Sequence, residues 1–549
     1  MANANRSHGP APMHWGSALF VLIIGGFMAI LDTSIVNIAI PKLESVFSVS
    51  TQEVQWVVTI YLLTLGAVVP LAGWLGERFG YRQVYMASLA VFTIGSALSG
   101  LSWSLGTLML FRVLQAVGGG LIMPVTMAML YRMVPRNQIG TAMGIWGVTA
   151  IVAPAIGPAL GGYLVQYVDW RLIFYINVPI GILGFFLSLA LVPPFAPTER
   201  LPLDSVGFGL SAAGLFGLLL GLSQGERWGW TSEPIVLIVA ASVLLLVLFV
   251  LWELTVPHPL LDLRVFGHGS FAVANLITVV VTIGMFAGVF YVPLFLQTVA
   301  GYGALKTGLM LMPSALATAL TMGLSGRLYD KIGAKPLVIP GLVILAYATY
   351  LLHNLSINTP VADVVFWLSV RGLGIGLTMM PAIAAGMSRV PPDLVATGSA
   401  INNIVQRIAG SFGLAALTAA LVRQEAVHAV YLSSAYTPVS GVAQKLLQTL
   451  SRQLGLAGML PPAATTVSLT LIHDQILETA FVMALDDVFV LAMAVTLSGI
   501  VFALFLRSFH TAPVAASSRG PSTRPQTGGV DPRETGDDRG TKSGSRSAS

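Results

Sequence analysis

Apolar runs of about 20 residues, separated by short polar breaks, repeat along almost the whole chain, and a run of this length crosses the hydrocarbon core of a bilayer as an α-helix. The pattern predicts an all-α integral membrane protein with fourteen transmembrane helices. The predicted spans begin near Gly16, Val54, Val84, Gly106, Ile139, Leu172, Val206, Pro234, Phe271, Thr307, Pro336, Val361, Gly398 and Phe481.

Composition agrees with this pattern and removes several classes of protein. Of the 549 residues, 55% are hydrophobic and 9% are charged, and the mean hydropathy is +0.82. Soluble domains carry about 25% charged residues, so a single soluble core is excluded. The chain has no cysteine, which excludes disulfides, thiolate metal sites and cysteine nucleophiles. The polar segment 1–15 lacks a signal-peptide pattern, so the first span is expected to be both anchor and insertion signal.

The distribution of Lys and Arg predicts the orientation, because loops on the cytoplasmic side carry the excess. With the N-terminus inside, ten basic residues fall in inner short loops and four in outer ones, and an even number of spans puts both termini in the cytoplasm of a multi-pass protein of the cell membrane. The pI near 9.4 follows from these loops, so nucleic acid is not an expected partner. The inner residues are Arg78, Arg82, Arg132, Arg136, Arg200, Arg264, Arg327, Lys331, Lys335 and Arg389, and the outer ones are Lys42, Arg171, Arg227 and Lys306.

Two segments lie outside the regular alternation of spans and short loops. The tail 511–549 is rich in Gly, Ser, Pro and Thr and is expected to be a disordered cytoplasmic extension. Residues 423–477 are expected to form a long outer loop, within which "VAQKLLQTLSRQLGLAGML" has amphipathic helical spacing. Three alternatives stay open for that stretch: it lies on the membrane surface, contacts a partner, or packs against neighbouring loops.

An internal repeat divides the chain. "GWLGERFGYR", from Gly73, and "GRLYDKIGAK", from Gly326, share glycines, a leucine, an acid and bases at the same spacing. A second pair, "FRVLQAVGGGLIMP" and "VRGLGIGLTMMP", places Arg112 and Arg371 before glycines and a proline. Two related halves are common in secondary transporters. The predicted parts are a six-helix bundle at 16–192, a linker with two extra helices at 193–269, and a second six-helix bundle at 270–510.

Asp32 is the one acid placed deep within spans 1 to 13. Asp32 and Arg112 both lie about 10–14 Å from the outer surface at 1.5 Å per residue, so their depth permits an ion pair. Tyr61 and Gln115 fall at similar levels. A lone charge at the centre of a span costs about 2.5–3.5 kcal/mol, which pairing, protonation or a water-filled cavity must offset. A static structural ion pair is the alternative to a functional one.

These motifs resemble the major facilitator superfamily, and within it the fourteen-span drug:proton antiporters of the EmrB/QacA type, over about Gly16 to Arg507. "GWLGERFGYR" resembles the loop motif between spans 2 and 3, with Glu77 where Asp is usual, and "GIWGVTAIVAPAIGPALGG" looks like the antiporter motif of span 5. "LDTSIVNIAIP", "WRLIFYINVPIG" and "VPLFLQTVAGYGALKTGL" resemble further stretches of the fourteen-span family. The cytoplasmic gate candidates are Gly73, Glu77, Arg78, Gly80, Arg82, Gly326, Asp330, Lys331, Gly333 and Lys335, and the antiporter-motif residues are Gly144, Pro154, Gly157, Pro158, Gly161 and Gly162.

The resemblance implies a major facilitator fold and proton-coupled efflux of lipophilic drugs across the cytoplasmic membrane. Asp32 and Arg112 are the proton-coupling candidates. Span 10 lacks the extra acid that some exporters of divalent cations carry, so monocationic or neutral compounds are expected. Candidates for the substrate cavity are Asn37, Tyr61, Gln115, Asn402, Gln406 and Arg407.

Other readings remain open at this point. The alternative function is proton-coupled transport of a specific metabolite or lipid-like compound. No nucleophile–base motif, metal-ligand cluster or Walker loop is present, so neither an enzyme nor a cofactor is expected, and the proton gradient is the expected energy source. The expected partners are the lipophilic substrate, protons and the bilayer. A periplasmic adaptor protein is a further candidate if the source is Gram-negative; otherwise a monomer is expected.

Overall fold

The structure is a computed structural model that describes residues 15–195, 197, 202–356, 359–391, 393–435 and 441–506. The N-terminal residues 1–14, Arg200 and the tail 511–549, on which predictions were made, lie outside the described residues. We call the side at which the first helix begins the inner side, after the orientation that the Lys and Arg distribution predicts.

The described chain is built from helices whose beginnings follow the predicted spans. The N-terminal part comprises α1 (Trp15–Phe47), α2 (Thr51–Val68), α3 (Leu71–Phe79), α4 (Tyr81–Gly100), α5 (Leu105–Met133), α6 (Ile139–Tyr167), α7 (Leu172–Tyr175) and α8 (Asn177–Leu191). Two helices follow, α9 (Ser205–Trp228) and α10 (Glu233–Glu253). The C-terminal part comprises α11 (Gly269–Thr298), α12 (Ala304–Ile332), α13 (Lys335–Leu351), α14 (Val361–Met387), α15 (Val395–Ala435), α16 (Gly441–Leu456) and α17 (Pro461–Phe505).

Thirteen of the described helical segments are long and apolar enough to cross a membrane, and the bent pair α2 and α3 makes a fourteenth. The bend is 57° and falls at Val69 and Pro70. Proline lacks a backbone N–H and its ring clashes with the preceding turn, which explains a break at this position. The predicted all-α membrane fold is therefore confirmed, with the second span broken near its inner end.

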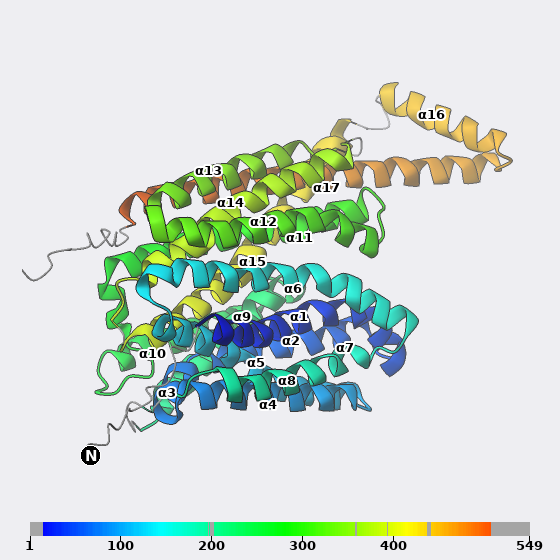
Figure 1. Cartoon of the computed structure of the whole chain (residues 1–549). Coiled ribbons are helices and arrows are strands. Elements are labelled where there is room, and N and C mark those ends of the chain that lie inside the picture. The colour runs from blue at the N-terminus through cyan, green and yellow to red at the C-terminus, as the bar shows by residue number, and fades with distance from the viewer. Residues whose placement is uncertain are drawn as a thin grey trace, which may run out of the picture. The chain divides into compact units, whose positions relative to one another are not determined.

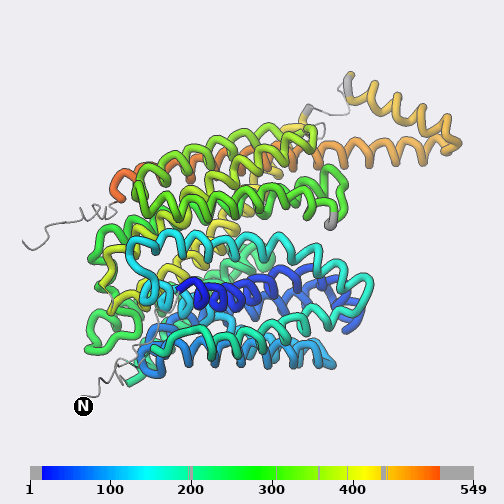
Figure 2. The backbone as a smooth tube through the Cα atoms, in the orientation of Figure 1, coloured from blue at the N-terminus to red at the C-terminus, as the bar shows by residue number. Residues whose placement is uncertain are grey.

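The helices fall into two groups that follow the halves of the sequence. In the N-terminal part α4 packs against α5 and α1 packs against α6, while in the C-terminal part α13 packs against α14 and α15 against α17. The two groups meet where α6 lies along α12. Figures 1 and 2 show this contact as the cyan α6 beside the green α12.

The segment predicted as a long outer loop is largely helical. Helix α15 continues to Ala435, and α17 begins at Pro461 rather than near Phe481. At 1.5 Å per residue the 45 residues of α17 span about 67 Å, more than twice the hydrocarbon core of about 30 Å. The amphipathic stretch forms α16, which packs on α17. Helix α16 and the first turns of α17 project together beyond the other helices (Figure 1).

Candidate functional site

An ion pair lies buried inside the N-terminal part. Asp32 on α1 and Arg112 on α5 both have 0% exposed side chains, and Arg112 Nη1 lies 2.5 Å from Asp32 Oδ2. The pairing inferred from depth alone is therefore present in the structure. Because both charges are removed from solvent, each depends on the other for compensation.

Two amides complete the coordination of the Asp32 carboxylate. Gln115 Nε2 donates to Asp32 Oδ1 at 2.8 Å, and its Oε1 accepts from Arg112 Nη1 at 2.8 Å. Gln115 and Arg112 are three residues apart on α5 and so share a helix face. Asn177 Nδ2 donates to the same Asp32 Oδ1 at 3.0 Å. The carboxylate thus accepts hydrogen bonds from three side chains on two other helices, α5 and α8.

Asn177 was not among the residues predicted from the sequence. It is the first residue of α8, directly after the break at Ile176 that separates α8 from α7. Its Nδ2 also contacts Ser96 Oγ at 3.1 Å, and Ser96 in turn donates to the Phe174 carbonyl at 2.9 Å. A polar residue within the apolar run of "WRLIFYINVPIG" was the available signal.

Aromatic rings enclose the arginine of the pair. The Arg112 guanidinium carbon lies 3.8 Å from the centroid of the Tyr61 ring and 5.8 Å from that of Phe174. Such cation–π contacts contribute about 0.5–2 kcal/mol, the upper value when the cation is desolvated. Arg112 Nε also donates to the Val57 carbonyl at 3.4 Å. Tyr61, from the bent second span, therefore touches the charge network directly.

Asp32 is the one acid that forms an ion pair with Arg112 among the described residues. The Arg112 charge would therefore lack a counter-ion without the Asp32 charge. Among the described residues, Arg112 Nη2 and Asn177 Oδ1 are buried without a hydrogen-bond partner. The cluster therefore holds one donor and one acceptor that its own hydrogen bonds do not use.

Of the remaining cavity candidates, Arg407 is the one that lies near the residues around the ion pair. Asn37 is exposed on α1. Gln406 Nε2 donates to Asn402 Oδ1 at 2.6 Å, and Asn402 Nδ2 donates to Asn275 of α11 at 3.4 Å. Arg407 is half-buried and close enough to Tyr61 to interact with it electrostatically.

The arginine that corresponds to Arg112 in the second half has different partners. Arg371 is buried on α14 and donates through Nε to Thr349 Oγ1 at 3.1 Å, and through Nη2 to the Gly284 and Met285 carbonyls. All these acceptors are neutral. Within the described residues the repeat therefore keeps the arginine but pairs it with a carboxylate in the N-terminal half alone.

The loop motif of the second half joins the two parts at the inner side. Asp330, near the end of α12, accepts hydrogen bonds from the backbone N–H groups of Gly140 and Thr141, both at 2.9 Å, and from Thr141 Oγ1 at 2.6 Å. The free N–H groups and the positive end of the α6 dipole favour a carboxylate at this position. A Cβ at Gly140 would lie 2.5 Å from the Gly326 carbonyl, so only glycine permits this approach of α6 and α12.

The loop motif of the first half makes a looser contact. Glu77 lies 3.8 Å from Arg132 of α5, and Arg78 lies over the Trp74 ring at 5.4 Å. Arg82 Nη2 donates to the Leu189 carbonyl at 2.6 Å. Gly80 has φ +88°, which disfavours other residues at the turn between α3 and α4. Of the other gate candidates, Gly73 faces α15, Gly333 has φ +79°, and Lys331 and Lys335 are exposed.

The antiporter-motif glycines of α6 face two different helices. A Cβ at Gly144 would lie 2.6 Å from the Met322 carbonyl of α12, whereas Cβ atoms at Gly157 and Gly161 would clash with Ser34 and Ile35 of α1. Helix α6 is continuous through Pro154 and Pro158. Because Pro158 lacks a backbone N–H, the Pro154 carbonyl has no donor within the helix, and it accepts from Ser34 Oγ at 3.2 Å. Gly162 has open space. The motif thus attaches α6 to the opposite half at its inner end and to α1 farther out.

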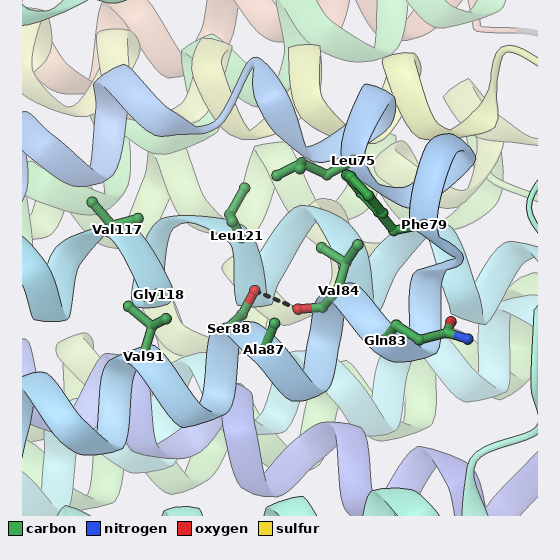
Figure 3. A pocket seen from close by; sticks show the side chains of 10 residues that line it. All are labelled: Leu75, Phe79, Gln83, Val84, Ala87, Ser88, Val91, Val117, Gly118 and Leu121. Carbon is green, nitrogen blue, oxygen red and sulfur yellow. Dashed lines mark hydrogen bonds between the residues drawn. The ribbon is translucent and has the colours of Figure 1, made fainter. Parts of the chain in front are cut away.

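A groove of about 320 Å³ on α3, α4 and α5 holds none of these candidates (Figure 3). The hydrogen bond drawn in Figure 3 lies within α4, where Ser88 Oγ donates to the Val84 carbonyl at 2.7 Å. No group of three or more metal-ligating side chains occurs in the part of the chain that the structure describes.

The sequence and the structure were compared with those of known proteins. The Major Facilitator Superfamily profile matches residues 22–414. The chain is 31% identical over 494 residues to the multidrug resistance protein B homolog of Mycobacterium tuberculosis strain H37Rv, covering 88% of this chain and 89% of that protein. It is 30% identical over 481 residues to the multidrug export protein EmrB of Haemophilus influenzae, covering 86% and 93%. The crystal structure of the human organic anion transporter MFSD10 superposes with a TM-score of 0.59 at 13% identity, covering 90% of this chain and all of that one, which supports the fold alone.

The chain belongs to the major facilitator superfamily of membrane transporters. Its relatives include one protein named for multidrug resistance and one named for multidrug export, so the predicted family is confirmed. Its fold and family are those of multi-pass transporters, not of enzymes.

Proposed function

We propose that this chain exports lipophilic compounds, monocationic or neutral, across the cell membrane in exchange for protons. The observation that carries the proposal is the fully buried Asp32–Arg112 pair with its amide donors Gln115 and Asn177. Buried ionisable residues in spans mark ion and substrate pathways, because their cost is otherwise too high to retain. The multidrug-export relatives support the choice of substrate class.

Asp32 links the proton to the compound by accepting only one of them at a time. Ionised Asp32 attracts a cationic compound or a proton, and protonation removes the attraction. With the N-terminus in the cytoplasm, a proton that enters from outside gains about 2.3 kcal/mol per 100 mV when its charge moves inward. The same inward movement gains the free energy of the pH gradient.

The inner gate motifs supply the alternation between the two faces. Asp330 holds the inner end of α6 against α12 through three hydrogen bonds. Release of these bonds opens the inner side, and their formation closes it, as expected for two repeats that rock about a central site. The coupling pair thus lies in the N-terminal repeat, and the gate joins that repeat to the second one.

An adaptor protein is a separate part of the proposal and applies to a Gram-negative source. The support is that α16 and the first turns of α17 project beyond the other helices as a hairpin (Figure 1). If the source has no outer membrane, the proposal is a monomer.

The test of the function is Asp32→Asn, which keeps the size of the side chain and removes its titration. We expect loss of proton-driven ethidium efflux and of resistance to a panel of lipophilic compounds in an efflux-deficient host. Membrane insertion should be unchanged. The matched control is Asp363→Asn, because Asp363 is an exposed acid at the start of α14. Efflux by Asp32→Asn at the rate of the control would refute the assignment.

A further inference from the structure

The two halves meet along two seams that differ in chemistry. On one seam α6 lies against α12, with Gly140 and Gly326 in backbone contact and Asp330 bonded to the end of α6. By the internal repeat, α15 of the second half should pack along the whole second span in the same way. It does pack on α3, the inner part of that span, but its larger contacts are with α5 and with the inserted helix α9, which in turn packs on α2.

Helix α9 is attached to the N-terminal half along its length. A Cβ at Gly66 of α2 would lie 2.5 Å from Leu219 Cδ1 of α9, which is therefore seated on that glycine. Nearer the outer side, Arg227 Nη1 donates to Gln55 Oε1 at 3.5 Å. Helix α9 therefore extends the N-terminal half and presents its other side to α15.

The contact between α9 and α15 is apolar. Leu210 of α9 packs into a hydrophobic cluster that includes Ile401, Ile404 and Val405 of α15 and Phe249 of α10. No hydrogen bond or ion pair joins α9 to α15 within the described ranges of the two helices. Lipid tails are as apolar as these side chains, so a bilayer can replace such contacts at little cost. Separation of α6 from α12 instead breaks three hydrogen bonds to a carboxylate.

The glycines of the two rocking helices agree with this difference. On the inner part of α6, Gly140 and Gly144 face α12 across the seam. Those of α15 face their own half: Cβ atoms at Gly410 and Gly413 would meet Phe286 and Ile283 of α11. Helix α15 therefore meets the opposite half through side chains, which can part without the loss of a close backbone contact.

We propose that the seam between α9 and α15 is a lateral opening through which compounds dissolved in the bilayer reach the charge cluster. Ile404 and Arg407 are three residues apart on α15, so a compound that passes Ile404 meets the guanidinium of Arg407 within one turn. Arg407 lies near Tyr61, whose ring covers Arg112. This inference rests on the proposed efflux function and assigns the inserted helix pair a role in access.

Cysteine chemistry tests the opening directly, since the chain contains no cysteine of its own. In vesicles, Ile404→Cys should react with a bilayer-soluble pyrene maleimide at least tenfold faster than with a charged, membrane-impermeant maleimide. The control is Leu219→Cys, since Leu219 of α9 is buried against Gly66 of α2, and this cysteine should react with neither reagent. Equal reaction of the two cysteines with the pyrene reagent, or reaction of Ile404→Cys with the charged reagent alone, would overturn the proposal. This measurement does not depend on transport.

Cross-linking then tests whether the opening is used. Leu210→Cys with Ile404→Cys, joined by a reducible bifunctional reagent, should lose ethidium efflux, and reduction should restore it. Gly66→Cys with Leu219→Cys joins α9 to α2 within one half and should keep efflux within about twofold. Undiminished efflux in the first pair, or equal loss in both, contradicts the lateral opening. Absence of ethidium efflux from the unmodified chain contradicts the proposed function instead.

Discussion

Removal of the Asp330 carboxylate should open the inner side of the protein. Asp330→Ala deletes three hydrogen bonds at the N-terminus of α6. Loss of a helix cap costs about 0.5–2 kcal/mol, and loss of a negative charge at the positive end of the helix dipole costs about 0.3–1 kcal/mol more. The closed arrangement should therefore weaken by about 1–3 kcal/mol, which changes its population ratio by about 5- to 150-fold.

The assay uses Met322, which is completely buried on α12 against the glycines of α6. In inverted vesicles, Met322→Cys should react with a charged maleimide about 5- to 150-fold faster when combined with Asp330→Ala, in proportion to the opened population. Asp330→Asn should give a smaller increase, because its amide oxygen still accepts hydrogen bonds. Asp363→Asn is the control and should leave the rate unchanged. Equal rates with and without Asp330→Ala would refute a gate role for this carboxylate.

Three further substitutions test the site and the packing of α6. Asn177→Ala removes a donor to Asp32 Oδ1, and a hydrogen bond to a charged group contributes about 1.5–3 kcal/mol. The rate of efflux in vesicles should therefore fall by about 10- to 100-fold while membrane insertion stays normal. An unchanged rate would contradict the assigned contact. Gly140→Ala should separate α6 from α12 and reduce both the thermal stability of the purified protein and efflux, whereas Gly162→Ala, which enters open space, should change neither. Tyr61→Leu should impair efflux by loss of the cation–π contact, while Tyr61→Phe keeps the ring and most of the rate; equal loss in both would assign the role to the hydroxyl instead.

The sequence was sufficient for features that depend on helix geometry alone. Because an α-helix rises by a fixed 1.5 Å per residue, the distances of Asp32 and Arg112 from their span ends already put them at one depth. The repeat likewise indicated that Asp330 belongs to an inner motif. Neither argument could identify the bond from Asp330 to Gly140, since the relation between two distant helix ends depends on how the halves pack.

Other features left too weak a signal in the sequence. Asn177 reaches Asp32 because the chain breaks at Ile176 and restarts as α8, and a break of one residue has no pattern in hydropathy. The last helix was predicted from Phe481 because the apolar run begins there, whereas the structure begins it at Pro461. Hydropathy detects the part of a helix that contacts lipid, not its continuation into water.

The neutral environment of Arg371 bears on the energetics of a transport cycle. Two homologous halves hold two buried arginines, yet within the described residues only Asp32 is an acid with 0% exposure. A single carboxylate binds a single proton. If Asp32 is the carrier, exchange of one proton for one monocation moves no net charge, so voltage cannot drive it and the pH difference alone sets the limit of accumulation. A neutral compound handled by the same residue would instead be exported electrogenically, and its steady-state ratio would depend on membrane potential as well.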